Sequence, residues 1–369
     1  ISPFQYLSVY RFARGWGGLE SGLNLGEWVT DGTTINKVLY EQSIPNTNVT
    51  WEVANQTDIG FESHLFNGKL RLEADYFYNL RSNILTQRNA SVPGSTGLTL
   101  PPENIGKVVN QGFEFVLSYG DKINNFQYDV SLNGGYAQNK IKFWDETPGI
   151  PEYQLTTGYP MNSRLFYQAI GIFRDQAAVD AYPHWQGARP GDIIFKDVND
   201  DGKINGLDQV RDYRSDIPTF TSGFNIDLAY NNFYTSILFQ GAFGKMRYHY
   251  VEGGVSGNYY LEDAIGRWTP DNPDATKPRA FNYVSEYWRS QDNTYWLRSA
   301  DYIRLKNIEF GYNVPQPLIS KLNVTGFRIY IGGLNLITWC PTLPSFDPES
   351  VSTNYPLNKV INIGAALTF

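Results

Sequence analysis

Residues 197–208, with the sequence DVNDDGKINGLD, combine side-chain types and a spacing that suit a calcium ion. A calcium loop of the EF-hand kind takes ligands from positions 1, 3, 5, 7, 9 and 12 and needs a glycine at position 6. Gly202 stands at that sixth position, and oxygen-bearing groups stand at the others. The predicted ligands are Asp197, Asn199, Asp201, the carbonyl of Lys203, Asn205 or a water molecule, and Asp208.

The flanks of this loop differ from those of an EF-hand, which places a helix on each side. GDIIFK, before the loop, alternates like a strand, and QVRDYRSDIPTF, after it, carries a proline and no apolar stripe at helical spacing. We therefore predict a structural calcium ion held by a loop next to a strand. The alternative is an acidic turn without metal, in which the side chains bond to their own backbone.

The other candidate contact residues are aromatic and lie in the two longest predicted loops. They are Tyr182, Trp185, Trp268, Trp288, Tyr295 and Trp296. One interpretation is that they pack against a captured ligand or a partner protein, and the alternative is ordinary core inside large folded loops. The chain shows no nucleophile–base set, phosphate-binding loop or paired metal-ligand spacing, so we predict that it is not an enzyme.

Composition favours an all-β protein. Aromatic residues make up 15% of the 369 residues, with 26 tyrosines, and such side chains suit a pleated surface. A net charge of −7 argues against a nucleic-acid partner. One cysteine, Cys340, excludes an internal disulfide. The sequence has no apolar run long enough for a transmembrane helix, but a barrel strand needs apolar residues only at alternate positions.

Alternation of apolar and polar residues is the strongest pattern in the chain. Asn67-Gly68 predicts a tight hairpin turn, and after it Leu70 and Leu72 share one face while Arg71 and Glu73 share the other. The same pattern recurs along the chain, up to the final strand NKVINIGAALTF. We count about ten such strands, an even number as bacterial barrels require.

Short and long connections alternate between these strands. The short ones are predicted near 67–68, 121–125, 231–232 and 314–325, and the long ones over 12–50, 81–106, 140–218, 245–298 and 338–357. This asymmetry is typical of an antiparallel transmembrane β-barrel, with short periplasmic turns and long extracellular loops. The alternative is a secreted, calcium-stabilised β-sandwich that binds glycans.

Several segments, in order, cover most of residues 45–369 and resemble one family. They are PNTNVTWEVANQTDIGFESHLFNGKLRLEADYFYNLRSNIL, ENIGKVVNQGFEFVLSYG, GDIIFKDVNDDGKINGLDQV, IPTFTSGFNIDLAYNNFYTSILFQGAFG, YIRLKNIEFGYNVPQPLISKLNVTGFRIYIGGLNLIT and FDPE. They are similar to the barrel of SusC/RagA-type TonB-dependent transporters of the Gram-negative outer membrane.

The resemblance implies that residues 1–369 form the C-terminal portion of a barrel of about 22 strands that is closed by a plug. The plug domain and the N-terminal half of the barrel are then expected outside this sequence. It further implies active import of oligosaccharides or peptides, energy from the TonB complex, a SusD-like surface lipoprotein as a lid, and outer-membrane lipid around the barrel.

Overall fold

The computed structural model describes residues 6–7, 9–12, 27–29, 35–37, 39–43, 45–88, 101–248, 261–280, 287–319, 324–343, 346–349 and 357–369. Most of the predicted loop 12–50 lies outside these ranges. The chain divides into two compact units. Unit 1 comprises Ile1–Gln56, Asn79–Asn110 and Asn139–Gly158, and unit 2 comprises Thr57–Tyr78, Gln111–Gln138 and Tyr159–Phe369.

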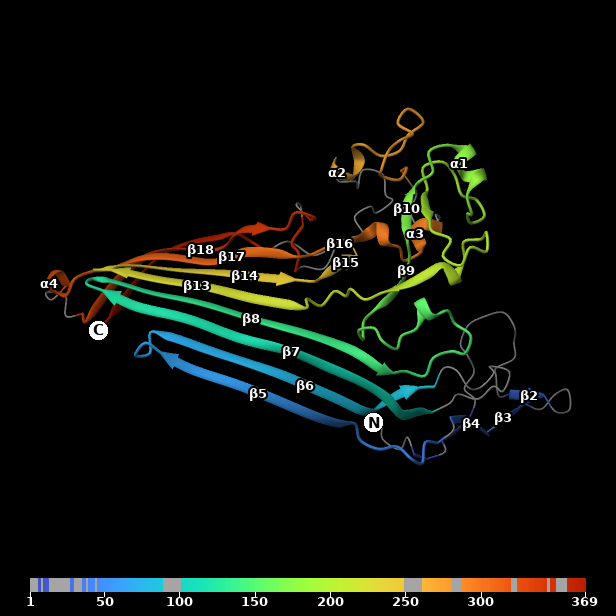
Figure 1. The fold of residues 1–369 in the computed structure, drawn as a ribbon, viewed down its shortest axis with the longest axis horizontal. Helices are drawn as coiled ribbons and strands as arrows, with labels where there is room; N and C mark the ends of the chain where they lie inside the picture. Colours follow the sequence, from blue (N-terminus) through green and yellow to red (C-terminus); the bar gives the residue numbers. More distant parts are fainter. Residues whose placement is uncertain are drawn as a thin grey trace. The chain divides into compact units, whose positions relative to one another are not determined.

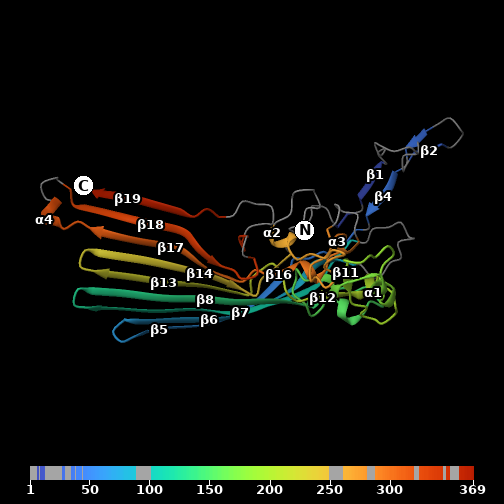
Figure 2. The same cartoon turned by 90° about the horizontal axis from the view of Figure 1, so that it is seen from above.

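Nine long strands form one antiparallel sheet in the order β19-β18-β17-β14-β13-β8-β7-β6-β5 (Figures 1 and 2). In chain order they are β5 (Val53–Leu65), β6 (Leu70–Gln87), β7 (Pro102–Ile123), β8 (Phe126–Phe143), β13 (Phe220–Tyr230), β14 (Phe233–Phe243), β17 (Tyr302–Asn313), β18 (Gly326–Trp339) and β19 (Val360–Thr368). The long strands form a single sheet, not two stacked sheets, so the β-sandwich alternative is wrong.

Short and long connections alternate along this sheet, but the predicted loop 81–106 is shorter than expected, because β6 extends to Gln87 and β7 begins at Pro102. Tight turns join β5 to β6, β7 to β8 and β13 to β14, and the longer turn from β17 to β18 contains α4 (Gln316–Ile319). Long connections join β6 to β7, β8 to β13, β14 to β17 and β18 to β19. Since neighbouring strands are antiparallel, the short and the long connections leave from opposite ends of the sheet.

The turn at Asn67-Gly68 is wider than the predicted two-residue hairpin. Phe66, Asn67 and Gly68 all have positive φ, and four residues separate β5 from β6. The left-handed backbone was expected here because glycine and asparagine tolerate it. Two-residue turns occur elsewhere in the sheet, at Asn124-Asn125 and at Asn231-Asn232, and the first residue of each has positive φ.

The strand register gives the sheet one apolar face and one polar face. An apolar row crosses four neighbouring strands through Val130, Ile226, Ile237 and Ile308. The adjacent row, which points to the other face, contains Asp129, Asp227, Ser236 and Glu309. Because side chains alternate with period two, every strand that joins this register extends the same two faces.

Unit 1 contains the short strands β1 (Val9–Phe12), β2 (Glu27–Val29), β3 (Ile35–Lys37) and β4 (Leu39–Ser43), and the 3-10 helix η2 (Glu152–Gln154). β1 pairs with β4, and β2 pairs with β3, in separate two-stranded sheets. The large sheet thus has nine strands in the described ranges, against the count of about ten made from the sequence. Asn104 exchanges hydrogen bonds with the backbone of Thr50 (both 2.9 Å) and ties the segment before β5 to β7.

Unit 2 carries, besides its strands of the large sheet, the short elements of the connections after β8 and after β14. They are β9 (Arg164–Tyr167), β10 (Ala169–Ile172), α1 (Gln176–Ala181), β11 (Ile193–Phe195), η3 (Gly206–Asp208), β12 (Gln209–Asp212), β15 (Met246–Tyr248), α2 (Leu261–Ala264), α3 (Tyr287–Ser290), η4 (Thr294–Trp296) and β16 (Leu297–Ser299). The pairs β9–β12, β10–β11 and β15–β16 are antiparallel. No helix in the described part of the chain is long and apolar enough to cross a membrane.

Candidate functional site

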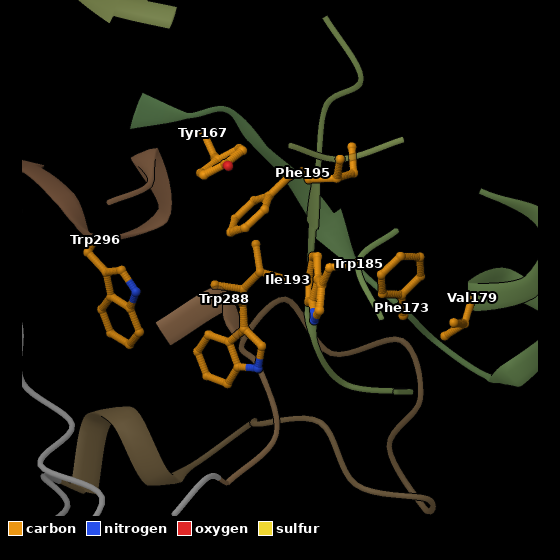
Figure 3. Packing of buried hydrophobic residues seen from close by; sticks show 9 residues of the cluster. Tyr167, Phe173, Val179, Trp185, Ile193, Phe195, Trp288 and Trp296 are labelled. Carbon is orange, nitrogen blue, oxygen red and sulfur yellow. The ribbon is translucent and has the colours of Figure 1, made fainter. Parts of the chain in front are cut away.

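The two long connections of unit 2 fold together around one aromatic core, which we call the loop module (residues 159–219 and 261–300). Figure 3 shows its buried side chains turned toward one another. The core consists of Tyr167, Phe173, Val179, Trp185, Ile193, Phe195, Ile204, Trp288 and Trp296. None of these residues comes from the nine-stranded sheet, so the module has a hydrophobic core of its own.

Three of the six aromatic residues that could contact a ligand are buried in this core. Trp288 is 0% exposed, Trp296 is 2% exposed and Trp185 is 7% exposed. Trp288 stacks on Trp296, with ring centroids 6.3 Å apart, and Trp185 stacks on Tyr287 at 5.1 Å. These contacts agree with the interpretation of a folded core, because side chains so enclosed have no surface left for a ligand.

The other three aromatic residues lie at the margin of the core. Tyr182 and Tyr295 pack against it and are half-buried. The Nε1 of Trp268 donates to the carbonyl of Arg174 (3.0 Å), and its ring lies against Gly191. With φ of +86°, Gly191 has a left-handed backbone, and a Cβ there would come within 2.6 Å of the Trp268 ring. This position joins the segment after β14 to the segment after β8.

Asp192 connects the same two segments by hydrogen bonds, which the alternation of apolar and polar residues does not predict. Its side chain is fully buried and accepts from Nε of Arg279 (2.7 Å) and Nε1 of Trp288 (2.9 Å). The buried charge is thus paired and hydrogen-bonded, as a low-dielectric site requires. Nearby, Arg289 lies over the Trp296 ring, and burial lowers the pKa of Arg289 to about 10.

The acidic loop at residues 197–208 sits between β11 and η3, so the strand predicted before it is present. The Oδ2 of Asp197 accepts from Gly202 N (2.8 Å), and Oδ1 of Asp201 accepts from Lys203 N (2.8 Å). The hydrogen bond from the Asn199 amide to Oδ2 of Asp201 (3.0 Å) holds the pKa of Asp201 below its ordinary value.

Asp208 closes the loop from a fully buried position. Its Oδ1 accepts from Val198 N and its Oδ2 accepts from Asn205 N, both at 2.8 Å. The Oδ1 of Asn205 accepts in turn from Leu207 N (2.8 Å). The side chains therefore bond to their own backbone, and no cluster of three or more His, Cys, Asp or Glu that could hold a metal occurs in the described ranges. Calcium binding at 197–208 stays a prediction.

A buried arginine cluster fastens the segment 346–349 to the polar face of the sheet. Arg304, on β17, has no exposed side-chain area; its Nη2 lies 2.9 Å from Oδ2 of Asp347, and its Nη1 lies 2.6 Å from Oε2 of Glu349. The hydroxyl of Tyr302 donates to the other Glu349 oxygen (2.6 Å), and the Nε of Arg304 donates to Thr338 (3.0 Å). The FDPE motif thus supplies two carboxylates to one guanidinium.

Two pockets of unit 2 lie on or beside the polar face. One, of about 650 Å³, is lined by polar and charged side chains that include Glu73, Asp75, Glu114 and Lys306. The other, of about 740 Å³, is lined by Glu349 and by four cationic side chains: Arg164, Arg214, Lys245 and Arg247. Since the apolar face carries exposed large side chains such as Ile363 (84% exposed), polar and apolar surfaces are separated by the sheet.

The chain matches known proteins in both sequence and fold. Residues 12–336 match the family model described as TonB dependent receptor-like, beta-barrel. Two curated TonB-dependent receptors of Formosa agariphila are 29% identical over 83% and 86% of this chain and over 31% and 33% of their own lengths. The chain therefore spans about a third of the curated relatives that it matches.

Solved structures of a RagAB peptide transporter show the same fold. One has a TM-score of 0.71 at 19% identity and covers 100% of this chain and 39% of that chain. The "open-open" state has a TM-score of 0.72 at 21% identity, with 100% and 38% covered. These findings confirm the resemblance drawn from the sequence. The chain belongs to the TonB-dependent receptor-like β-barrel family of the bacterial outer membrane.

Proposed function

We propose that the protein containing this chain imports oligosaccharides or peptides actively across the outer membrane. The observation that carries the proposal is the sheet with two unlike faces within a TonB-dependent receptor barrel. The apolar row through Ile226, Ile237 and Ile308 suits lipid, and the row with Asp227 and Glu309 suits a hydrated interior. Family membership points to transport, not to catalysis.

We further propose that TonB supplies the energy and that a SusD-like surface lipoprotein acts as a lid. The loop module supports the lid, because a folded body with its own core offers a defined surface at the end of the sheet from which the long connections leave. The RagAB structures are described as those of a peptide transporter. At 19–21% identity they support the fold, and the choice between peptide and oligosaccharide rests on experiment.

Uptake by cells tests the transport proposal. Cells that lack the gene should fail to take up one class of labelled oligomer, and the restored gene should return uptake only while TonB is present. Uptake that continues at the full rate without TonB would contradict active transport. Purification of the full-length protein from outer membranes in mild detergent tests the lid, which should co-purify at one copy per barrel.

A further inference from the structure

The pocket of about 740 Å³ beside Glu349 has an excess of positive charge. Its charged lining consists of Arg164, Arg214, Lys245, Arg247, Asp216 and Glu349, four cations and two carboxylates. Glu349 is already bound by Arg304 and Tyr302. The charge that remains in the pocket is therefore positive.

Two of the four cations have carboxylate partners. Arg214 makes a bidentate pair with Asp212. Its Nε donates to Oδ1 (2.9 Å) and Oδ2 (3.2 Å), and its Nη2 donates to Oδ2 (2.6 Å). Arg164 pairs with Asp292. Arg164 also lies over the rings of Phe166 and Tyr248, which stack on each other at 6.0 Å. These two arginines and the two rings form a fixed wall of the pocket.

The other two cations bind only backbone carbonyls. Nη1 of Arg247 donates to the carbonyl of Asp347 (2.9 Å), and Nζ of Lys245 donates to the carbonyl of Pro348 (3.1 Å). Nη2 of Arg304 donates to both oxygens of the Asp347 carboxylate (3.0 and 2.9 Å). Neither Lys245 nor Arg247 forms a salt bridge with a residue in the described ranges.

Arg247 is the more unusual of the two, because it is 9% exposed and its Nη2 is buried without a hydrogen-bond acceptor in the described part of the chain. Burial lowers the pKa of Arg247, and the negative charge of Asp347 opposes that shift only in part. A buried guanidinium that lacks an ionic partner is costly, and that cost is removed when an anion enters. Arg247 is buried, carries a positive charge, lacks an acceptor for Nη2 in the described ranges and lies beside a cavity. This combination indicates a site for an anionic ligand.

We propose that this pocket binds a carboxylate group of the transported ligand between the side chains of Arg247 and Lys245. Its aromatic wall keeps the surroundings of the ion pair low in dielectric, which strengthens charge-assisted hydrogen bonds. The substrate class is thus an acidic oligomer, either an oligosaccharide with uronic acids or a peptide with acidic side chains. This inference rests on the proposed transport function and adds the substrate's charge to it.

Binding to the full-length protein in detergent tests the inference without any need for transport. The probes are tetragalacturonate and its methyl ester, and acetyl-tetra-aspartate amide and its asparagine counterpart, titrated by calorimetry. One of the two acidic probes should bind, its neutral counterpart should bind at least about tenfold more weakly, and the affinity should fall as salt is added. The acidic probe that binds identifies the source of the carboxylate.

Two variants and a matched control locate the site. Arg247→Gln and Lys245→Gln should each weaken the acidic probe about tenfold, while Arg174→Gln, an exposed arginine of the loop module, should leave it within about twofold. A shift in gel migration on heating shows that each barrel is folded, and Lys245→Gln serves if Arg247→Gln fails to fold. Wild-type affinity in both variants overturns the inference, as does a failure of both acidic probes to bind. If either of these results is obtained and TonB-dependent uptake of a neutral oligomer is still observed, the inference about the acidic substrate fails and the transport proposal remains supported.

Discussion

The carboxylates of the acidic loop accept hydrogen bonds from backbone N–H groups of the same loop. If calcium binds there, its effect should be measurable as a change in how readily the loop is cleaved by a protease. Asp197→Ala and Asp201→Ala each remove a carboxylate that would offset the double charge of the ion, so calcium should bind more weakly. Without the ion, the remaining oxygens repel one another and the loop loosens. We expect faster proteolysis near Gly202 in both variants, and the same acceleration when a chelator is added to the wild-type protein. Calcium titration in the wild type should slow the cleavage.

Asp200→Asn is the matched control for this experiment. Asp200 is an acidic residue of the same loop at a position without a ligand role, and its φ of 55° is one that asparagine tolerates. It should be cleaved at the wild-type rate with and without calcium. Equal cleavage of the wild type in chelator and in calcium would mean that the stretch is an acidic turn without metal.

Arg304 gives a second prediction at the level of single residues. Arg304→Met should remove the guanidinium that pairs with the Asp347 carboxylate, which is 7% exposed, at a cost of about 3–5 kcal/mol for removing one side of a buried pair. We expect the backbone of 346–349 to exchange hydrogen much faster. Arg328→Met, which removes an arginine whose side chain is 45% exposed and lies 4.0 Å from Glu309, should change exchange little. Similar exchange in both variants would exclude a fastening role for Arg304.

Sequence alternation could place Arg304 on the polar face of its strand, but it could not find the partners of that side chain. Asp347 and Glu349 lie 43 and 45 residues further along the chain, across β18 and its following turn. A periodic pattern reports which face a side chain occupies, and it carries no information on which distant loop returns to that face. The same holds for Asp192, whose partner Trp288 is 96 residues away.

At the scale of elements, the strands were predictable where apolar and polar residues alternate, whereas the end of β6 and the start of β7 were assigned to the loop 81–106. The register from β8 to β19 is antiparallel throughout and interrupted only by irregularities, one of them between Leu238 and Phe239 where β14 meets β17. The secondary structure inside the long loops was not predictable, because the short strands β9 to β12 are only three or four residues long. Segments of that length show too few alternations for the period to be recognised.

The two faces of β14 give a prediction that needs only adjacent residues. Ile237→Arg should destabilise the folded barrel by about 2–4 kcal/mol if the residue lies near the bilayer midplane, because the guanidinium must then enter lipid. Ser236→Arg should cost little, since its neighbours across the strands are Asp227 and Glu309. Urea titration of barrels folded into liposomes, read by gel migration before heating, measures both. Equal losses would argue against a lipid-facing row through Ile237.

At the scale of the whole molecule, different interactions stabilise the loop module and the large sheet. The module has an aromatic core of nine buried residues, none of which belongs to the sheet. The sheet depends on its ladder of backbone hydrogen bonds between neighbouring strands, and lipid replaces water on its apolar face. Such a division lets the loop module rearrange while the hydrogen-bond ladder of the sheet stays intact.

Removal of one core side chain should therefore separate the stability of the module from that of the barrel. Trp288→Ala deletes a fully buried indole and should cost the module about 3–5 kcal/mol, because the cavity loses contacts that the neighbours cannot restore. We expect rapid cleavage within 159–219 and unchanged heat resistance of the barrel on gels. Trp51→Ala, at a position 78% exposed, should change neither reading. Loss of barrel heat resistance in Trp288→Ala would show that the two parts unfold together, since a core without sheet residues could affect the ladder only through such coupling.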